Sequence, residues 1–204
     1  VLEELNRITD KYCVPHYMMN VEITESVFVH DFRKISEEID NFHKAGFQVW
    51  MDDFGSGYSS LNVLKDYSFD ELKIDIEFLA HFTEKAKSVI ESTVRMAKKI
   101  SVQTLAEGVE TKEQLNFLKS IGCEKIQGYY FGKPMPYDNV VERIKEQHWV
   151  TETREMAQYY DAAGREDFLT NRPFALLEDD GTKFRYLFVN NEFMKSLATA
   201  GTTY

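Results

Sequence analysis

The stretch that decides the fold is Asp52-Asp53-Phe54-Gly55-Ser56-Gly57, in which two adjacent carboxylates precede two glycines. An apolar run at residues 47–51 comes before it and predicts a buried strand. The glycines predict that this strand ends in a loop. Two carboxylates at the end of a buried strand are unfavourable unless a positive group holds them. One divalent metal ion or a pair of them would do so, and a solvated loop with incidental acids is the alternative.

The bulk properties limit the classes of function. The chain has 204 residues, enough for one domain with a real core, or for one domain and part of another. Its net charge of -10 argues against binding to duplex nucleic acid or to anionic membranes. It leaves room for a phosphate ligand held through metal ions. The sequence predicts no membrane span and no signal peptide, and therefore a cytoplasmic location.

The two cysteines, Cys13 and Cys123, lie far apart in apolar, helix-like contexts. They form no zinc-binding pattern and no disulfide framework. We expect both to be reduced and to lie in or near the core.

Strand-like and helix-like stretches alternate up to about residue 148. The predicted strands are residues 18–24, 47–51, 71–76, 102–106 and 125–130. Apolar residues recur at helical spacing between them, with Gly46 as a stop signal after one helix and Gly122 after another. Thr111 and Gln114 have the spacing of a capping box. This alternation predicts a parallel sheet with right-handed crossovers.

Polar residues mark the ends of all five predicted strands. They are Glu22, Asp52, Asp53, Lys73, Glu107 and Gln127. In a (β/α) barrel the carboxyl ends of several strands converge on one site, whereas an open doubly wound sheet has a single crevice. Polar residues spread over five strand ends favour the barrel.

The rhythm changes after Trp149. We expect a barrel domain over residues 1–149, a helical linker over residues 150–170 and a small α+β extension over residues 171–204. The extension has two predicted strands, residues 174–177 and 186–189, with the hairpin signal Asp179-Asp180-Gly181 between them and a short helix over residues 190–198.

Five motifs occur in order, and together they closely resemble the EAL-domain phosphodiesterases of bacteria. They are Val21-Glu22-Ile23-Thr24-Glu25-Ser26, Asp52-Asp53-Phe54-Gly55-Ser56-Gly57-Tyr58-Ser59-Ser60-Leu61, Lys73-Ile74-Asp75, Ala106-Glu107-Gly108-Val109-Glu110-Thr111 and Gln127-Gly128-Tyr129-Tyr130-Phe131-Gly132-Lys133-Pro134-Met135-Pro136. Members of that family adopt a modified (β/α) barrel. They linearise the second messenger cyclic di-GMP to pGpG with Mg²⁺ or Mn²⁺. The resemblance covers residues 1 to about 149, so the implied fold is α/β, an EAL-type barrel.

The resemblance implies a two-metal site. Its metal ligands are Glu22, Asp52, Asp53 and Glu107, with Asp52 as the bridging carboxylate. Two ions about 3.5–4 Å apart can deprotonate water, neutralise a phosphate and hold the leaving oxygen. Lys73 is implied as a catalytic residue that positions the attacking water or stabilises phosphate charge, and Glu107 as a second catalytic residue. A structural salt bridge from Lys73 to Asp75 or Asp52 is the alternative.

The remaining implied positions surround the metals. Gln127 and Glu110 are implied substrate contacts; Gln127 could instead be satisfied by the backbone, and Glu110 could cap the helix that begins near Thr111. The resemblance also implies a lid loop and its anchor. These are Phe54, Gly55, Ser56 and Gly57 for the loop and Glu25 for the anchor.

The sequence departs from the family pattern in one respect. No Glu-Ala-Leu motif occurs among the 204 residues, and neither does the metal-binding asparagine that follows that motif. Both would fall before Val1, so we expect a barrel that is incomplete at its N-terminus. Because Val1 begins in the middle of a helical pattern, we expect a fragment of a longer, multidomain parent. The alternative is an oligomer, such as a homodimer, in which a second copy completes the sheet.

The leading functional prediction is a signalling phosphodiesterase specific for cyclic di-GMP, inactive as an isolated chain. The alternatives are a cyclic di-GMP-binding regulatory module without turnover, and a dimerisation fragment. The tail resembles the opening of a PAS sensor domain and stops too early to complete one; an extension that packs on the barrel is the alternative.

Overall fold

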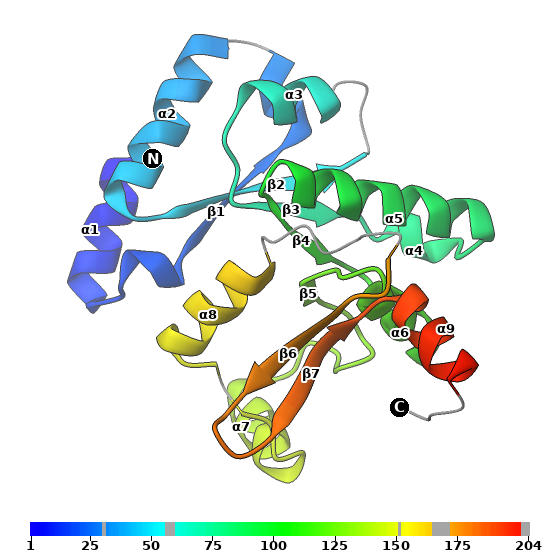
Figure 1. The fold of residues 1–204 in the computed structure, drawn as a ribbon. Coiled ribbons are helices and arrows are strands. Elements are labelled where there is room, and N and C mark those ends of the chain that lie inside the picture. The colour runs from blue at the N-terminus through cyan, green and yellow to red at the C-terminus, as the bar shows by residue number, and fades with distance from the viewer. Residues whose placement is uncertain (30–31, 56–59, 151, 165–171, 201–204) are drawn as a thin grey trace.

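Five parallel strands form one sheet at the centre of the computed structural model, which describes residues 1–29, 32–55, 60–150, 152–164 and 172–200 (Figure 1). The strands lie in chain order: β1 Asn20–Thr24, β2 Gln48–Phe54, β3 Glu71–Ile74, β4 Gln103–Ala106 and β5 Lys125–Ile126. All four neighbouring pairs are parallel. The predicted architecture is confirmed as an α/β fold with the parallel sheet of an incomplete (β/α) barrel.

Helices connect and cover the strands. They are α1 Leu2–Tyr12, η1 His16–Met18, η2 Glu25–Val29, α2 Phe32–Ala45, α3 Ser60–Asp66, α4 Glu77–Ala80, α5 Glu84–Lys99, α6 Lys112–Ser120 and α7 Tyr137–Glu146. The predicted capping box at the start of α6 is confirmed, with the Thr111 hydroxyl accepting from the Gln114 amide. The stop after α2 is confirmed as well, because Gly46 has a φ of 90°, which favours glycine.

The apolar core lies between the sheet and its helices. Alternate residues of β2 and β3 point toward the helices, among them Val49, Met51 and Leu72, which are fully buried. Ile90 and Val94 of α5 are buried in the same cluster. Burying one such side chain contributes about 1.5–3 kcal/mol, so this outer layer contributes much of the stability of the sheet.

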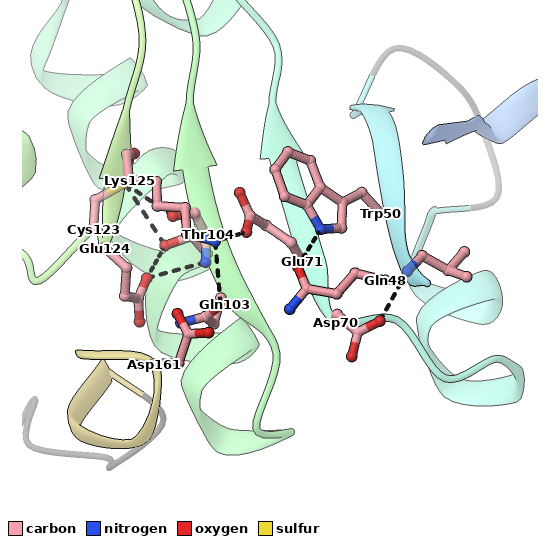
Figure 2. A network of polar contacts seen from close by, with 11 residues as sticks. Gln48, Trp50, Asp70, Glu71, Gln103, Thr104, Cys123, Glu124, Lys125 and Asp161 are labelled. Atoms are coloured by element: carbon pink, nitrogen blue, oxygen red, sulfur yellow. Dashed lines mark hydrogen bonds and ion pairs between the residues drawn. The ribbon is translucent and has the colours of Figure 1, made fainter. Parts of the chain in front are cut away.

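The opposite face of the sheet is polar, and two lysines lie on it. One is Lys73, described with the site below. The other is Lys125, whose ammonium contacts the buried Glu71 carboxylate at 2.6 Å and lies 5.1 Å from the centre of the Trp50 ring. Lys125 and Glu71 belong to a network of polar contacts at the amino ends of β3, β4 and β5, here called the lower network, which Figure 2 shows. Burial raises the pKa of Glu71, and the Lys125 charge opposes that rise.

Several expectations differ from the structure. β1 begins at Asn20 instead of residue 18, and β3 ends at Ile74 instead of residue 76. β2 continues through Asp52 and Asp53 to Phe54, so the acidic pair lies within the end of the strand rather than after it. β5 ends at Ile126 instead of residue 130, because the chain then turns to follow the segment after β4, with the Tyr130 amide donating to the Val109 carbonyl at 2.9 Å. Cys123 is buried as expected, but Cys13 is exposed. It ends α1 with a φ of 54°, at a surface turn.

The C-terminal part contains a separate two-stranded sheet and two helices. The sheet is the antiparallel pair β6 Ala175–Asp179 and β7 Phe184–Val189; helix α8 Arg154–Gly164 precedes it and α9 Asn191–Thr199 follows it. The predicted turn is confirmed, with Gly181 at a φ of 82°. Strand β7 contacts α6 of the barrel portion. The boundaries at residues 149 and 170, and the likeness to a PAS domain, stay predictions. None of the helices in the described part of the chain is both long and apolar enough to cross a membrane.

Candidate active site

Lys73 lies at the centre of a cluster of carboxylates at the carboxyl end of the sheet. Its ammonium is 2.8 Å from Glu22 Oε2, 2.9 Å from Asp52 Oδ1 and 3.0 Å from Glu107 Oε1. These partners come from β1, from β2 and from the residue after β4, and Lys73 itself comes from β3 between them. Four strand ends that are far apart in the sequence therefore meet at one point, as the barrel prediction requires.

Local backbone contacts fix this arrangement. The Glu107 amide donates to the Ile74 carbonyl at 3.1 Å, which holds the segment after β4 against the end of β3. Thr24, the last residue of β1, pairs with Asp52 of β2, which places Asp52 level with the carboxyl end of β1. Because side chains alternate along a strand, Lys73 shares its face with the residue two positions before it and not with Ile74.

The cluster carries excess negative charge. Among the described residues one ammonium contacts three carboxylates, so two of the three negative charges have no matching cation there. Burial lowers the pKa of Lys73, but the hydrogen bonds that its ammonium donates to Glu22, Asp52 and Glu107 outweigh burial, so that the pKa lies above its ordinary value. Lys73 is therefore protonated at neutral pH and acts as a cation here, not as a base.

Asp53 adds a further acid beside this cluster. It adopts a φ of 55°, and the register between β2 and β3 shifts at this point. Its amide donates to Asp52 Oδ1 at 3.0 Å, which orients the Asp52 carboxylate. Burial, the Asp52 charge and a hydrogen bond with Asp75 raise the pKa of Asp53. Asp75 itself accepts from the Glu77 amide at 2.6 Å and so belongs to the start of α4.

The predicted lid begins at a buried Phe54 and an exposed Gly55. Gly55 has a φ of 97°, and a Cβ there would lie 2.5 Å from the Phe78 ring. An open pocket of about 400 Å³ lies beside Gly55 between α4 and α5, to one side of the Lys73 cluster. Ser56 and Gly57 lie outside the described residues. Glu25, the predicted anchor, begins η2 directly after β1, and its side chain lies outside the described part of the structure as well.

Gln127 and Glu110 lie outside the Lys73 cluster, in the loops that follow β5 and β4 and form the rim of the site. Both are exposed. The Gln127 amide donates to the Ala106 carbonyl at 2.9 Å, and the Glu110 amide donates to Gln114 Oε1 at 2.8 Å. Glu110 thus sits just ahead of the capped start of α6. Their roles as substrate contacts stay predictions, and so does the catalytic and metal-binding assignment of the clustered residues.

The donor set fits a divalent metal in kind, because carboxylate oxygens are preferred ligands of Mg²⁺ and Mn²⁺. In this structure, however, the carboxylate oxygens are spaced for hydrogen bonds to the Lys73 ammonium and not for bonds to a metal ion. Three oxygens lie 2.8–3.0 Å from the Lys73 nitrogen, whereas Mg–O bonds are about 2.0–2.1 Å long. Within the described residues no three of the histidine, cysteine and carboxylate side chains are grouped so that they could hold a metal ion.

Sequence reasoning missed the residues that hold the loops of the site together. A Cβ on Gly108 would lie 2.1 Å from the Ile76 side chain, and a Cβ on Gly128 would lie 2.1 Å from the Val109 carbonyl oxygen. Gly108 and Gly128 stand in the motifs quoted above, so glycines in two motif segments were an available signal. Nothing in the sequence indicated which residues these glycines contact, because Ile76 and Val109 are distant from them in the chain.

Comparisons with known proteins agree on one family. A family model described as EAL domain matches residues 1–134. The chain is 37% identical over 138 residues to the cyclic di-GMP phosphodiesterase PdeR of Escherichia coli strain K12, a match that covers 67% of this chain and 20% of PdeR. The chain spans only 15 to 29% of the length of the curated relatives it matches.

Solved structures show the same likeness. The EAL domain of DcpA from Mycobacterium smegmatis superposes with a TM-score of 0.66 at 32% identity, covering 71% of this chain and 66% of that one. BlrP1 from Klebsiella pneumoniae, solved as a complex with manganese and cyclic di-GMP, superposes with a TM-score of 0.52 at 31% identity, covering 55% of this chain and 29% of that one.

Proposed function

Since the chain belongs to the EAL-domain family, we propose that it supplies the main acidic part of a phosphodiesterase site that hydrolyses cyclic di-GMP to pGpG. The observation that carries the proposal is the Lys73 cluster, in which carboxylates from two strands and from the residue after a third surround one lysine at the carboxyl end of the sheet. Excess negative charge at that position is unfavourable in the free protein and becomes useful when cations and a phosphodiester arrive together.

We assign a separate role to each residue of the cluster. Glu22 and Glu107 flank the site from two sides, and Asp52 and Asp53 lie between them; these four would hold the metal ions. When bound, two divalent ions supply a more acidic water and neutralise the phosphate. For these oxygens to hold metal ions, Lys73 would have to leave at least two of its present partners, because its nitrogen lies at the point where their oxygens converge. Displaced toward the phosphate, its ammonium stabilises developing negative charge there.

Gln127 and Glu110 are proposed to contact the ligand from the rim. An amide side chain both donates and accepts, as recognition of a guanine edge or of a bound water requires. Gly55 and the residues after it are proposed to cover the site, since a glycine with positive φ lets the backbone turn immediately after the acidic pair.

A second candidate function is supported by a specific observation. The carboxylates are arranged around an ammonium at hydrogen-bonding distance, and the described residues contain no ready-made metal group. A protein that keeps this arrangement when cyclic di-GMP binds would be a receptor without turnover. In such a protein Lys73 stays paired, and metal ions do not change ligand affinity.

The decisive experiment uses a chimaera and the chain itself. The Glu-Ala-Leu segment of a relative, such as the DcpA EAL domain, is fused ahead of Val1, because that motif does not occur in the 204 residues. Both proteins are incubated with cyclic di-GMP and Mn²⁺, and binding and pGpG formation are measured. We expect turnover from the chimaera, abolished by Asp52→Asn, and none from the 204-residue chain alone.

The outcomes separate the hypotheses. A folded chimaera that binds cyclic di-GMP independently of Mn²⁺ and forms no pGpG supports the receptor. A folded chimaera that neither binds nor cleaves rejects both functions. Lys65→Met serves as the control variant, because Lys65 is an exposed surface residue and its loss should leave turnover unchanged.

A further inference from the structure

Helix α8 crosses the amino-terminal side of the sheet, opposite the Lys73 cluster. Near its start the Arg154 guanidinium lies 4.4 Å from the centre of the Tyr17 ring, just before β1. Near its end Asp161 Oδ1 accepts from Gln103 Nε2 at 2.9 Å, at the first residue of β4. Figure 2 shows Asp161 beside Gln103 at the foot of the polar network. The helix therefore reaches from one edge strand of the sheet to its far half.

The contact at the end of α8 is built from buried groups. Lys98, whose side chain is fully buried, donates to the Gly164 carbonyl at 2.9 Å and pairs with Glu124. A cation at this position complements the negative carbonyl end of a helix. A Cβ on Gly164 would lie 2.9 Å from the Glu124 side chain, so the helix end fits closely only as glycine. Gln103 is buried, and without Asp161 its side-chain NH2 group would lose the acceptor that it has in this structure.

The same helix also binds the C-terminal hairpin. The Tyr160 hydroxyl accepts from the Arg185 guanidinium of β7 at 2.7 Å. Tyr160 and Asp161 are neighbours in the chain, so consecutive residues of α8 contact the hairpin and the barrel portion. A single peptide unit therefore separates the contact with the hairpin from the contact with the first residue of β4.

The amino-terminal ends of β3, β4 and β5 are connected to one another by polar contacts. Gln103 Oε1 lies 3.5 Å from the Lys125 ammonium, and Lys125 contacts Glu71 at 2.6 Å. Glu71 is two residues before Lys73 on β3, and Gln103 is four residues before Glu107. The residues that α8 organises thus stand on the strands whose opposite ends carry the site.

We propose that α8 acts as a strap, a segment that couples the C-terminal hairpin to the strands of the site. Its attachment to the sheet depends on the contacts of Asp161 and Gly164. Release of the strap loosens the hairpin and the foot of β4 together while the outer apolar core stays closed. The proposal concerns the mechanics of the fold and stands whether the site is an enzyme or a receptor.

Hydrogen exchange by mass spectrometry on the whole 204-residue chain tests it. We expect Asp161→Ala to speed amide exchange by about tenfold in three places: α8, the β6–β7 hairpin and the first residues of β4, because a buried donor loses its partner. Exchange in β2, at Val49 and Met51, should not change. Asp161→Asn is the matched control, since its carbonyl can still accept from Gln103, and it should exchange like the parent chain.

A second variant tests the close packing independently. Gly164→Val should produce the same pattern as Asp161→Ala, because its side chain forces the helix end away from Glu124. The proposal is overturned if α8 already exchanges in the parent chain as fast as an unstructured peptide. Equal behaviour of the Ala and Asn variants, an unchanged hairpin, or an equal rise in β2 would overturn it too.

Discussion

Replacing Lys73 with methionine tests the electrostatic account of the site most directly. The change keeps the length and the apolar stem of the side chain and removes only the ammonium. Each hydrogen bond to a charged group contributes about 1.5–3 kcal/mol when it is shielded from water. Lys73 is 8% exposed, but its partners Glu22, Asp52 and Glu107 are 43%, 19% and 24% exposed. Water and salt therefore replace much of the lost attraction.

The net effect follows from these two opposing contributions. Discounting for exposure leaves a destabilisation of about 2 kcal/mol, which for a chain of this length lowers the melting temperature by about 4–8 °C. Because the remaining cost is repulsion among three carboxylates, it should shrink in about 0.5 M salt, where charges are screened within a few ångströms.

Thermal unfolding followed by circular dichroism, first in chelator and then in Mn²⁺, provides the assay. Without the ammonium the carboxylates are free to bind the ion, and a metal present at about ten times its dissociation constant adds about 1.4 kcal/mol. Mn²⁺ should thus raise the melting temperature of Lys73→Met more than that of the parent chain. Lys65→Met, which removes an exposed lysine, is the control. Equal melting of Lys73→Met and parent in chelator, or equal stabilisation of both by Mn²⁺, would refute the reasoning.

Three further predictions concern residues around the site and in the core. Gly128→Ala should destabilise the chain by about 1–3 kcal/mol, measured by urea unfolding, because the new methyl meets the rigid Val109 backbone; a neutral result would contradict the contact. Burial raises the pKa of Glu71 above its ordinary 4.5, so its contribution to stability is complete below pH 4.5 and is lost as the pH rises through the higher folded value. Unfolding free energies at several pH values should accordingly show parent stability falling relative to Glu71→Gln as pH rises, and the opposite slope would exclude this account. Burial raises the pKa of the Cys123 thiol to about 12, so iodoacetamide should label only exposed Cys13 in the native chain; double labelling without denaturant would show that Cys123 is accessible.

The sequence predicted the sheet well because its evidence was local. Apolar runs bounded by turn residues located all five strands, and the Thr111 capping box marked the start of α6 within one residue. The convergence of Glu22, Asp52 and Glu107 followed from a rule of parallel folds, in which carboxyl ends of strands share one edge. That rule needs only strand direction and no knowledge of side-chain contacts.

The remaining features depended on contacts that no local pattern carries. The lower network joins Gln103 to Asp161, which are 58 positions apart, and Lys125 to Glu71, which are 54 apart. The positive φ of Asp53 arises from a register shift between two strands and not from the residue type, since aspartate adopts that conformation only occasionally. The length of β5 was overestimated because the aromatic residues after Gln127 are of the types common in strands. In the structure the backbone there pairs with the loop after β4 instead.

The inner and outer faces of the sheet serve different purposes. The outer face, with residues such as Met51 and Leu72, is closed and apolar, and it carries the stability of the fold. The inner face holds ion pairs around Lys73 and Lys125, and such pairs contribute little net stability because desolvation offsets their attraction. The charges of the inner face can consequently be rearranged by a ligand without unfolding the sheet. This separation explains how Lys73 can lie among the acids at the carboxyl end of the sheet while the apolar outer face keeps the fold stable.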